Sequence, residues 1–253
     1  MREDILVGGW HSVLMALKRS PHLCKEIWLL SNDNRSGFIE HEKVITSAGL
    51  RPQFVDRKTL TKIYEGDGHH GVVLKRRLPD LTSLKEFLSD QPATRENNPL
   101  ILVLDRIQDP GNFGACLRVA ACAGVDAVIY PNNNSAQITG AVAQAASGAL
   151  DVLQLVRVPN VANALRELSK AGVWLIGSAE NGGQCLYNVD FSLPTAIIVG
   201  NEGSGIRELT RNLCDIVVSL PSGKLLSSLN VSSAATVLIY EALRQRISES
   251  EMS

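Results

Sequence analysis

The sequence lacks the features that mark most membrane, secreted and metal-binding proteins. No apolar run approaches the length of a membrane span, and the opening from Met1 to Asp4 is not that of a signal peptide. The five cysteines form no C-x-x-C pair, so we expect reduced thiols, a cytoplasmic protein and no metal site. No histidine follows residue 70, which removes the usual general base from the rest of the chain.

Two familiar phosphate-binding motifs are also absent. Gly200, Gly203 and Gly205 follow an apolar, strand-like run in the order G-x-x-G-x-G, whereas the dinucleotide fingerprint is G-x-G-x-x-G. Gly223 and Lys224 lack the upstream glycine and the following hydroxyl of a P-loop. The glycine-rich turn, which carries Glu202, fits a tight strand-to-helix turn and a ligand site equally well.

Charge is nearly balanced, with a net value of −1, but it is unevenly distributed. Residues 1–76 hold 12 Lys+Arg against 9 Asp+Glu, and residues 77–253 hold 13 against 17. The first part, which also holds all five histidines, is basic enough to contact phosphates. An ordinary solvated surface explains the same figures.

The composition shifts between residues 77 and 98, which we interpret as a linker with one short helix near 81–88. Before it, helical and strand-like pieces alternate at 12–18, 26–30, 41–48, 53–55 and 71–74, as in a small α/β domain spanning 1–76. After it, strands are expected near 100–104, 127–130, 153–158, 173–177, 196–199 and 215–220. Helices are expected between them near 113–123, 136–147, 161–170 and 205–212, with a last one near 231–247. This alternation predicts an α/β domain at 99–253 with a mostly parallel sheet covered on both faces.

A second segment of interest runs from Leu102 to Gly124. Its strand ends at Asp109-Pro110-Gly111-Asn112, and the small-residue helix that follows carries one charge, Arg118. A guanidinium among small apolar neighbours needs a partner. We therefore expect either a structural ion pair with Asp105 or Asp109, or an arginine held in a cleft for an anionic group.

A third segment runs from Leu220 to Ala235. A turn after a strand-like run is followed by Ser227, Ser228, Asn230, Ser232 and Ser233, and then by an apolar helix. Such small polar residues are typical N-caps, but five within seven residues exceed what one cap needs. Capping and a ligand-binding loop both remain open.

In this order and spacing, the three segments resemble the motifs of the SpoU-type branch of the SPOUT superfamily of RNA ribose 2′-O-methyltransferases. The first motif is matched by Asn112 and Arg118, the second by Gly200, Glu202 and Gly203, and the third by Ser228, Leu229 and Asn230. The sequences Gly9-Trp10-His11 and His69-His70-Gly71-Val72-Val73 resemble the family's amino-terminal substrate-binding domain. One departure is visible, because Lys224 stands where the family usually has glycine.

The resemblance implies a ribosomal-protein-like RNA-binding domain at 1–76 and a trefoil-knotted methyltransferase domain at 99–253. It implies S-adenosylmethionine as cofactor, held mainly by backbone groups at Gly200, Leu220 and Leu229. Arg118 is implied as the catalytic residue, with Asn112, Glu202, Ser228 and Asn230 positioning it, the ribose and the base. For Glu202, an equally supported alternative is that it fixes the glycine-rich loop through backbone amides.

The resemblance further implies a homodimer joined through the helices near 113–123 and 231–247. The substrate it implies is structured RNA, in particular a guanosine in the peptidyl-site loop of 23S rRNA, with tRNA as the alternative. Arginine is a poor base because its pKa exceeds about 12, so Arg118 acts either as a base assisted by a substrate phosphate or as an orienting group. Two further alternatives are a catalytically silent RNA-binding relative, in which Lys224 has altered the cofactor loop, and an enzyme acting on small molecules.

Overall fold

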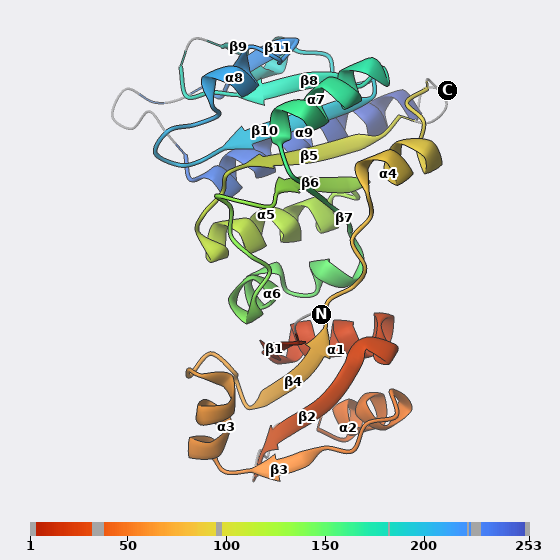
Figure 1. Cartoon of the computed structure of the whole chain (residues 1–253), viewed down its shortest axis with the longest axis vertical. Coiled ribbons are helices and arrows are strands. Elements are labelled where there is room, and N and C mark those ends of the chain that lie inside the picture. Colours follow the sequence, from red (N-terminus) through yellow and green to blue (C-terminus); the bar gives the residue numbers. More distant parts are fainter. Residues whose placement is uncertain are drawn as a thin grey trace. The chain divides into compact units, whose positions relative to one another are not determined.

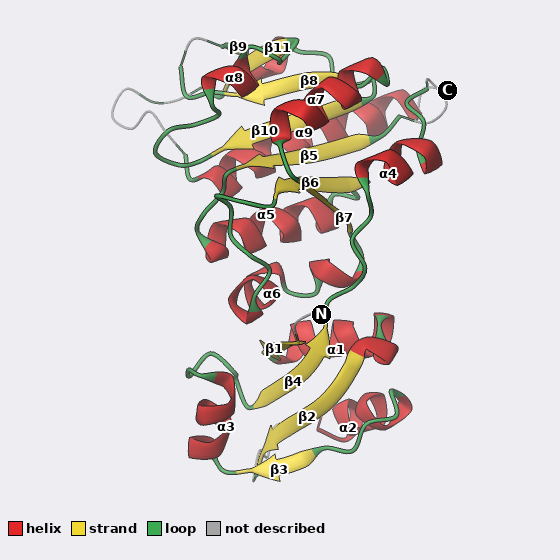
Figure 2. Ribbon diagram, viewed as in Figure 1, coloured by secondary structure: helices red, strands yellow, loops and turns green. Residues whose placement is uncertain are grey.

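The computed structural model describes residues 4–31, 38–94, 98–181, 183–221, 223 and 229–250. The chain divides into two compact units. The first unit comprises Met1–Asp80 together with Ile138–Val152, and the second comprises Leu81–Gln137 together with Leu153–Ser253. Each unit is built on its own sheet (Figures 1 and 2).

The first unit contains a mixed sheet of four strands in the order β1 (Asp4–Gly8), β4 (Val72–Arg77), β2 (Cys24–Leu30) and β3 (Gln53–Val55). Strand β4 is antiparallel to both of its neighbours, and β3 is parallel to β2. Helices α1 (Trp10–Arg19), α2 (Phe38–Ser47) and α3 (Arg57–Tyr64) complete the fold with the short η1 (Pro21–Leu23). All five predicted pieces are present.

Strand β1 and helix α3 were not predicted. Helix α3 is only eight residues long and buries one residue, Leu60, so its apolar pattern is too short to distinguish a helix from a loop. It begins because Asp56 accepts a hydrogen bond from the backbone N–H of Thr59 at 2.7 Å.

The second unit contains a seven-stranded sheet whose pairings are all parallel. The strand order is β7 (Gln154–Val158), β6 (Ala127–Pro131), β5 (Leu100–Asp105), β10 (Thr195–Gly200), β8 (Trp174–Ser178), β11 (Ile216–Ser219) and β9 (Gln184–Cys185). Every residue of the central strands β5 and β10 is buried, which explains their continuous apolar runs. Six strands were predicted, and the two-residue β9 was not.

Helices cover both faces of this sheet (Figure 1). On one face, α4 (Leu84–Asp90) and α7 (Val161–Lys170) pack against Ile101, Val103 and their neighbours. On the other, α5 (Pro110–Cys122) contacts α9 (Val231–Ser250), and its Phe113 ring packs edge-on against Tyr130 at 5.3 Å. The short α8 (Glu208–Arg211) and η3 (Leu186–Asn188) complete the unit. A mostly parallel sheet covered on both faces is therefore confirmed.

The helix expected near 136–147 forms over Gly140–Ala146 (α6), followed by η2 (Ala149–Asp151), and belongs to the first unit. A Cβ atom on Gly140 would lie 2.2 Å from the carbonyl oxygen of Leu6 in β1. Asp151 accepts two hydrogen bonds from Arg76 at 2.7 and 2.6 Å, and both side chains are buried. Breaking a buried pair of this kind is costly, so residues 138–152 are an integral part of the first unit.

Candidate active site

The site lies in the second unit, at the carboxyl edge of β5 and β10. From β5 the chain proceeds to β6 and β7 on one side, whereas β8, β11 and β9 lie on the other side, beyond β10. In open parallel sheets, ligands bind outside the carboxyl ends of the strands where the strand order reverses. The loops that follow β5 and β10 meet at this edge.

The loop after β5 positions Asn112. Asp109 accepts a hydrogen bond from the backbone N–H of Asn112 at 2.7 Å, and Pro110 occupies the first turn of α5. This arrangement fixes Asn112 at the start of the helix with its side chain half-buried.

The glycine-rich turn after β10 folds back onto Gly200. A Cβ atom on Gly200 would lie 2.1 Å from the carbonyl carbon of Gly205, so the position accepts no side chain. Asn201 closes the turn, because its Oδ1 accepts from Gly203 N at 3.0 Å and its carbonyl from Gly205 N at 2.7 Å. Gly205 has a φ of 63°, in the left-handed region.

Three of the predicted site residues, one from each segment, form a single hydrogen-bonded cluster. Asn230 Nδ2 donates to Glu202 Oε1 at 2.7 Å and to Asn112 Oδ1 at 2.9 Å, and Asn112 Nδ2 also donates to Glu202 Oε1. Asn230 Oδ1 accepts from the backbone N–H of Ser232 at 2.9 Å, at the first turn of α9. Within the described residues, the hydrogen-bond partners of Glu202 are the side-chain amides of Asn112 and Asn230, whereas Asn201 accepts from backbone amides of the turn.

Beside this cluster lies a cavity of about 520 Å³. Gly200, Leu220 and Leu229, the three predicted cofactor contacts, all line it, as does Glu202. The remaining lining mixes apolar and polar groups from the segment after β8, the end of β10, the glycine-rich turn and α9, including Ala179, Asn181, Val199, Ile206 and Ala234.

Arg118 is exposed on α5. Within the described residues it makes no ion pair, so the prediction of a structural pair with Asp105 or Asp109 is wrong. The expectation that its surroundings are apolar also fails, because α5 turns Cys116, Leu117 and Ala120 inward and Arg118 outward. Its charge is available at the surface.

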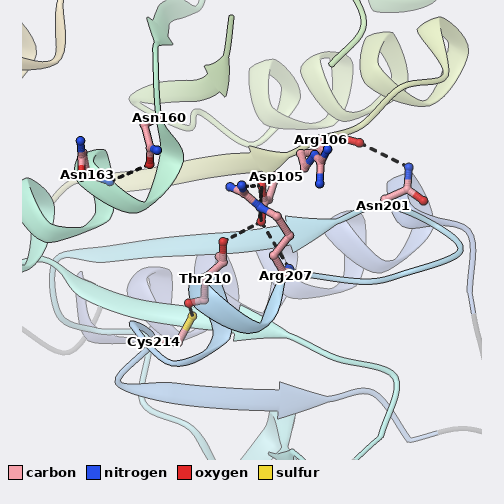
Figure 3. A network of polar contacts seen from close by, with 8 residues as sticks. All are labelled: Asp105, Arg106, Asn160, Asn163, Asn201, Arg207, Thr210 and Cys214. Atoms are coloured by element: carbon pink, nitrogen blue, oxygen red, sulfur yellow. Dashed lines mark hydrogen bonds and ion pairs between the residues drawn. The ribbon is translucent and has the colours of Figure 1, made fainter. Parts of the chain in front are cut away.

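Asp105, at the end of β5, belongs to a network that the sequence did not predict (Figure 3). Its buried carboxylate accepts from Arg207 Nε at 3.1 Å, from Arg207 Nη2 at 2.9 Å and from Thr210 Oγ1 at 2.7 Å. A single aspartate after an apolar strand was the available signal, but its partners follow about a hundred residues later. This network fixes the start of α8 against the end of β5.

The cysteines nearby are not candidate nucleophiles. Burial raises the pKa of Cys116 to about 12, with a smaller contribution from the charge of Glu202. Burial likewise raises the pKa of Cys214 to about 12. Both remain protonated thiols near neutral pH.

Ser228 and Lys224 lie outside the described residues. Within the described ranges, no group of three or more His, Cys, Asp or Glu side chains is placed to hold a metal ion. No helix in this part of the chain is both long and apolar enough to cross a membrane.

Two family models match the chain. The model described as the SpoU rRNA Methylase family matches residues 99–240. The model described as RNA 2′-O ribose methyltransferase substrate binding matches residues 6–80.

Individual proteins match along nearly the whole chain. The 23S rRNA (guanosine-2′-O-)-methyltransferase RlmB of Ralstonia nicotianae is 41% identical over 97% of this chain and 98% of its own. The protein of the same description from Pasteurella multocida is 40% identical over 98% and 100%. The SpoU methyltransferase AviRb from Streptomyces viridochromogenes, solved in complex with AdoMet, superposes with a TM-score of 0.78 at 26% identity, over 97% of this chain and 91% of that one.

These findings confirm the resemblance that the three segments indicated and its order of domains, with substrate binding first and the methylase second. One model covers more than half of the residues, and the relatives align from end to end. The chain therefore belongs to the SpoU rRNA methylase family.

Proposed function

We propose that the chain uses S-adenosylmethionine to methylate the ribose 2′-hydroxyl of a guanosine in 23S rRNA. Relatives that are about 40% identical along the full chain are 23S rRNA (guanosine-2′-O-)-methyltransferases. The observation that carries the proposal is geometric. The three motif segments, more than a hundred residues apart at their extremes, meet in one hydrogen-bonded cluster beside one cavity.

The residues of the cavity fit the cofactor. S-adenosylmethionine joins a nucleoside to a charged amino acid, so its site must combine apolar surface with exposed backbone groups. The cavity offers both, since Leu220 and Leu229 provide apolar surface and the three glycines at 200, 203 and 205 leave backbone groups of the turn uncovered by side chains of their own. These residues would hold the cofactor, which supplies the methyl group as a sulfonium electrophile.

The contribution of the protein is then alignment and electrostatic stabilisation. Glu202 Oε1 is held by the amides of Asn112 and Asn230, which places a carboxylate of fixed orientation at the cavity. We assign this cluster to positioning the ribose and the base. Arg118 brings a guanidinium cation, which donates hydrogen bonds and accepts none, so we assign it to orienting the hydroxyl and stabilising the developing oxyanion.

Recognition of the RNA is assigned chiefly to the first unit. The substrate-binding family model matches there, and residues 1–76 carry three more basic than acidic side chains. Within 23S rRNA we propose the peptidyl-site loop as the target, because unstacked bases of a loop are accessible to a protein. A cytoplasmic location and the trefoil knot are part of the same proposal.

We also propose a homodimer joined through α5 and α9. One stripe of α9 is buried within the unit through Val231, Ala235, Leu238, Ile239 and Ala242. A second stripe exposes Tyr240 and Ile247, seven residues apart and therefore on one side of the helix. Two large apolar side chains on that side suit a two-fold interface next to Arg118 on the adjoining helix.

The decisive experiment maps 2′-O-methyl groups by mass spectrometry in rRNA and tRNA from cells with and without the gene. Loss of one methyl group from a 23S rRNA guanosine is expected. If a methyl group is lost from a tRNA alone, the substrate is that tRNA and not 23S rRNA. No loss from any RNA, together with no S-adenosylmethionine binding by calorimetry, would leave an RNA-binding relative without activity.

A further inference from the structure

A second cavity, of about 200 Å³, lies at the carboxyl ends of β5, β6 and β7. Two arginines, Arg106 and Arg207, line it together with the three asparagines Asn133, Asn134 and Asn160. None of the described residues that line it is acidic. Residues 77–253 as a whole are acidic, with 17 Asp+Glu against 13 Lys+Arg, so a cavity lined by two arginines is unusual in this part of the chain.

The charges around this cavity leave one arginine uncompensated. The nearby carboxylate of Asp105 is already saturated by Arg207 and Thr210, as Figure 3 shows. The guanidinium of Arg106 has no hydrogen-bond or ion-pair partner in the described ranges, although the residue is partly buried. The cavity therefore carries a net single positive charge.

The backbone of Arg106 is held in a conformation that arginine rarely adopts. Its φ is 67°, which costs a residue with a Cβ atom about 1 kcal/mol relative to glycine. Its carbonyl accepts a hydrogen bond from Asn201 Nδ2 at 3.3 Å, drawn in Figure 3. Because Asn201 also lines the first cavity, this bond connects the two cavities.

The asparagine on the opposite side of the cavity adds a donor. Asn160 Oδ1 caps α7 by accepting from the backbone N–H of Asn163 at 3.2 Å. The group that Asn160 can offer a ligand is then its amide nitrogen. The amino-terminal end of the ten-residue helix α7 contributes a further partial positive charge at the same place.

We propose that this cavity binds a backbone phosphate of the substrate RNA, next to the nucleotide that is methylated. A phosphodiester offers acceptor oxygens and one negative charge, which match guanidinium and amide donors without a competing carboxylate. The fold places this phosphate site next to the proposed cofactor cavity, since Ile206 lines the first cavity and Arg207, the next residue, lines the second. The inference rests on the proposed function, because it takes RNA as the substrate.

The test uses the full chain and a 23S rRNA fragment that contains the peptidyl-site loop. Arg106→Asn removes the charge while keeping a residue that tolerates a left-handed φ, so its melting temperature should equal or exceed that of the wild type. RNA affinity should fall on the order of tenfold. The slope of log K against log salt concentration, where K is the association constant for RNA, should become shallower by about one. Affinity for S-adenosylmethionine should not change.

Lys170→Gln is the matched control, because it removes one positive charge from the exposed end of α7, away from both cavities. A fragment with a neutral methylphosphonate linkage beside the target guanosine should weaken binding to the wild type and not to Arg106→Asn. If Arg106→Asn binds RNA with the affinity and salt slope of the Lys170→Gln control, the phosphate site is refuted. Methylation of the fragment by the wild type, measured in parallel, tests the proposed function separately.

Discussion

Two carboxylates lie at the same edge of the second sheet and differ in almost every physical respect. Asp105 ends β5, is buried, and is saturated by a guanidinium and a hydroxyl. Glu202 follows β10, is exposed, and accepts hydrogen bonds from two neutral amides, of which Asn230 Nδ2 lies at 2.7 Å. A buried carboxylate with a cationic partner holds structure together, whereas an exposed one held by neutral amides keeps its charge for a ligand. Four substitutions test this difference.

The largest effect is expected at Gly200, which lies between the two carboxylates at the end of β10. In Gly200→Val, and already in Gly200→Ala, the new Cβ atom would meet the backbone of Gly205 at 2.1 Å, so the turn must open. Binding of S-adenosylmethionine should become undetectable by calorimetry. Gly66→Ala, in the first unit and away from the cavity, is the control, since a Cβ atom there would meet nothing within 4 Å beyond its own chain neighbours. Unchanged affinity in Gly200→Val would remove Gly200 from the site.

The next largest effect is expected at Arg118, a cation that neither carboxylate neutralises. Arg118→Ala should lower the rate of methyl transfer by about a hundredfold to a thousandfold, as loss of an oxyanion-stabilising donor does. Cofactor affinity and melting temperature should stay at wild-type values, because Arg118 is exposed and the cavity is lined by other residues. Single-turnover methylation measures the effect, and a near wild-type rate would contradict the assignment.

Asp105 should affect stability more than chemistry. Asp105→Asn keeps the size of the side chain but leaves Arg207 without its counter-charge, which should lower the free energy of unfolding by about 2–3 kcal/mol. Urea denaturation measures the loss. Asp109→Asn is the matched control, because asparagine caps a helix as well as aspartate does. Equal stability of the two variants would show that the Asp105 network contributes nothing.

The smallest of the four effects is expected at Glu202, where both the change in stability and the change in rate should be modest. Glu202→Gln should leave stability within about 0.5 kcal/mol, because the side chain is exposed. It should lower methyl transfer by about tenfold, since one carboxylate oxygen of the positioning cluster becomes an amide. Glu208→Gln, exposed at the start of α8, controls for the loss of charge. A Glu202→Gln variant with full activity and reduced stability would reverse the roles of the two carboxylates.

The comparison shows where sequence patterns succeed for the site. Asn112, Glu202 and Asn230 lie in segments of unusual composition and were named through their resemblance to the family motifs, and they form one cluster. Gly200, Leu220 and Leu229, which the resemblance names as cofactor contacts, line one cavity. Arg118 was named through the resemblance, whereas the expectation that it is closely packed proved wrong, since α5 turns Cys116, Leu117 and Ala120 inward and leaves Arg118 exposed.

By itself, the sequence determined the alternation of strands and helices, the parallel sheet and the family, because buried strands, caps and glycine turns are written in short local patterns. It did not determine β1, which pairs with the distant β4, or the place of residues 138–152, whose buried ion pair joins Asp151 to Arg76. Helix α3 was missed because it is only eight residues long. Only the tertiary structure showed that Asp105 pairs with Arg207 rather than with Arg118. It also showed that the guanidinium of Arg106, beside a second cavity, has no ion-pair partner among the described residues. The physical reason is that the partner of a charge is decided by distance in space, and a local pattern carries no information about groups a hundred residues away.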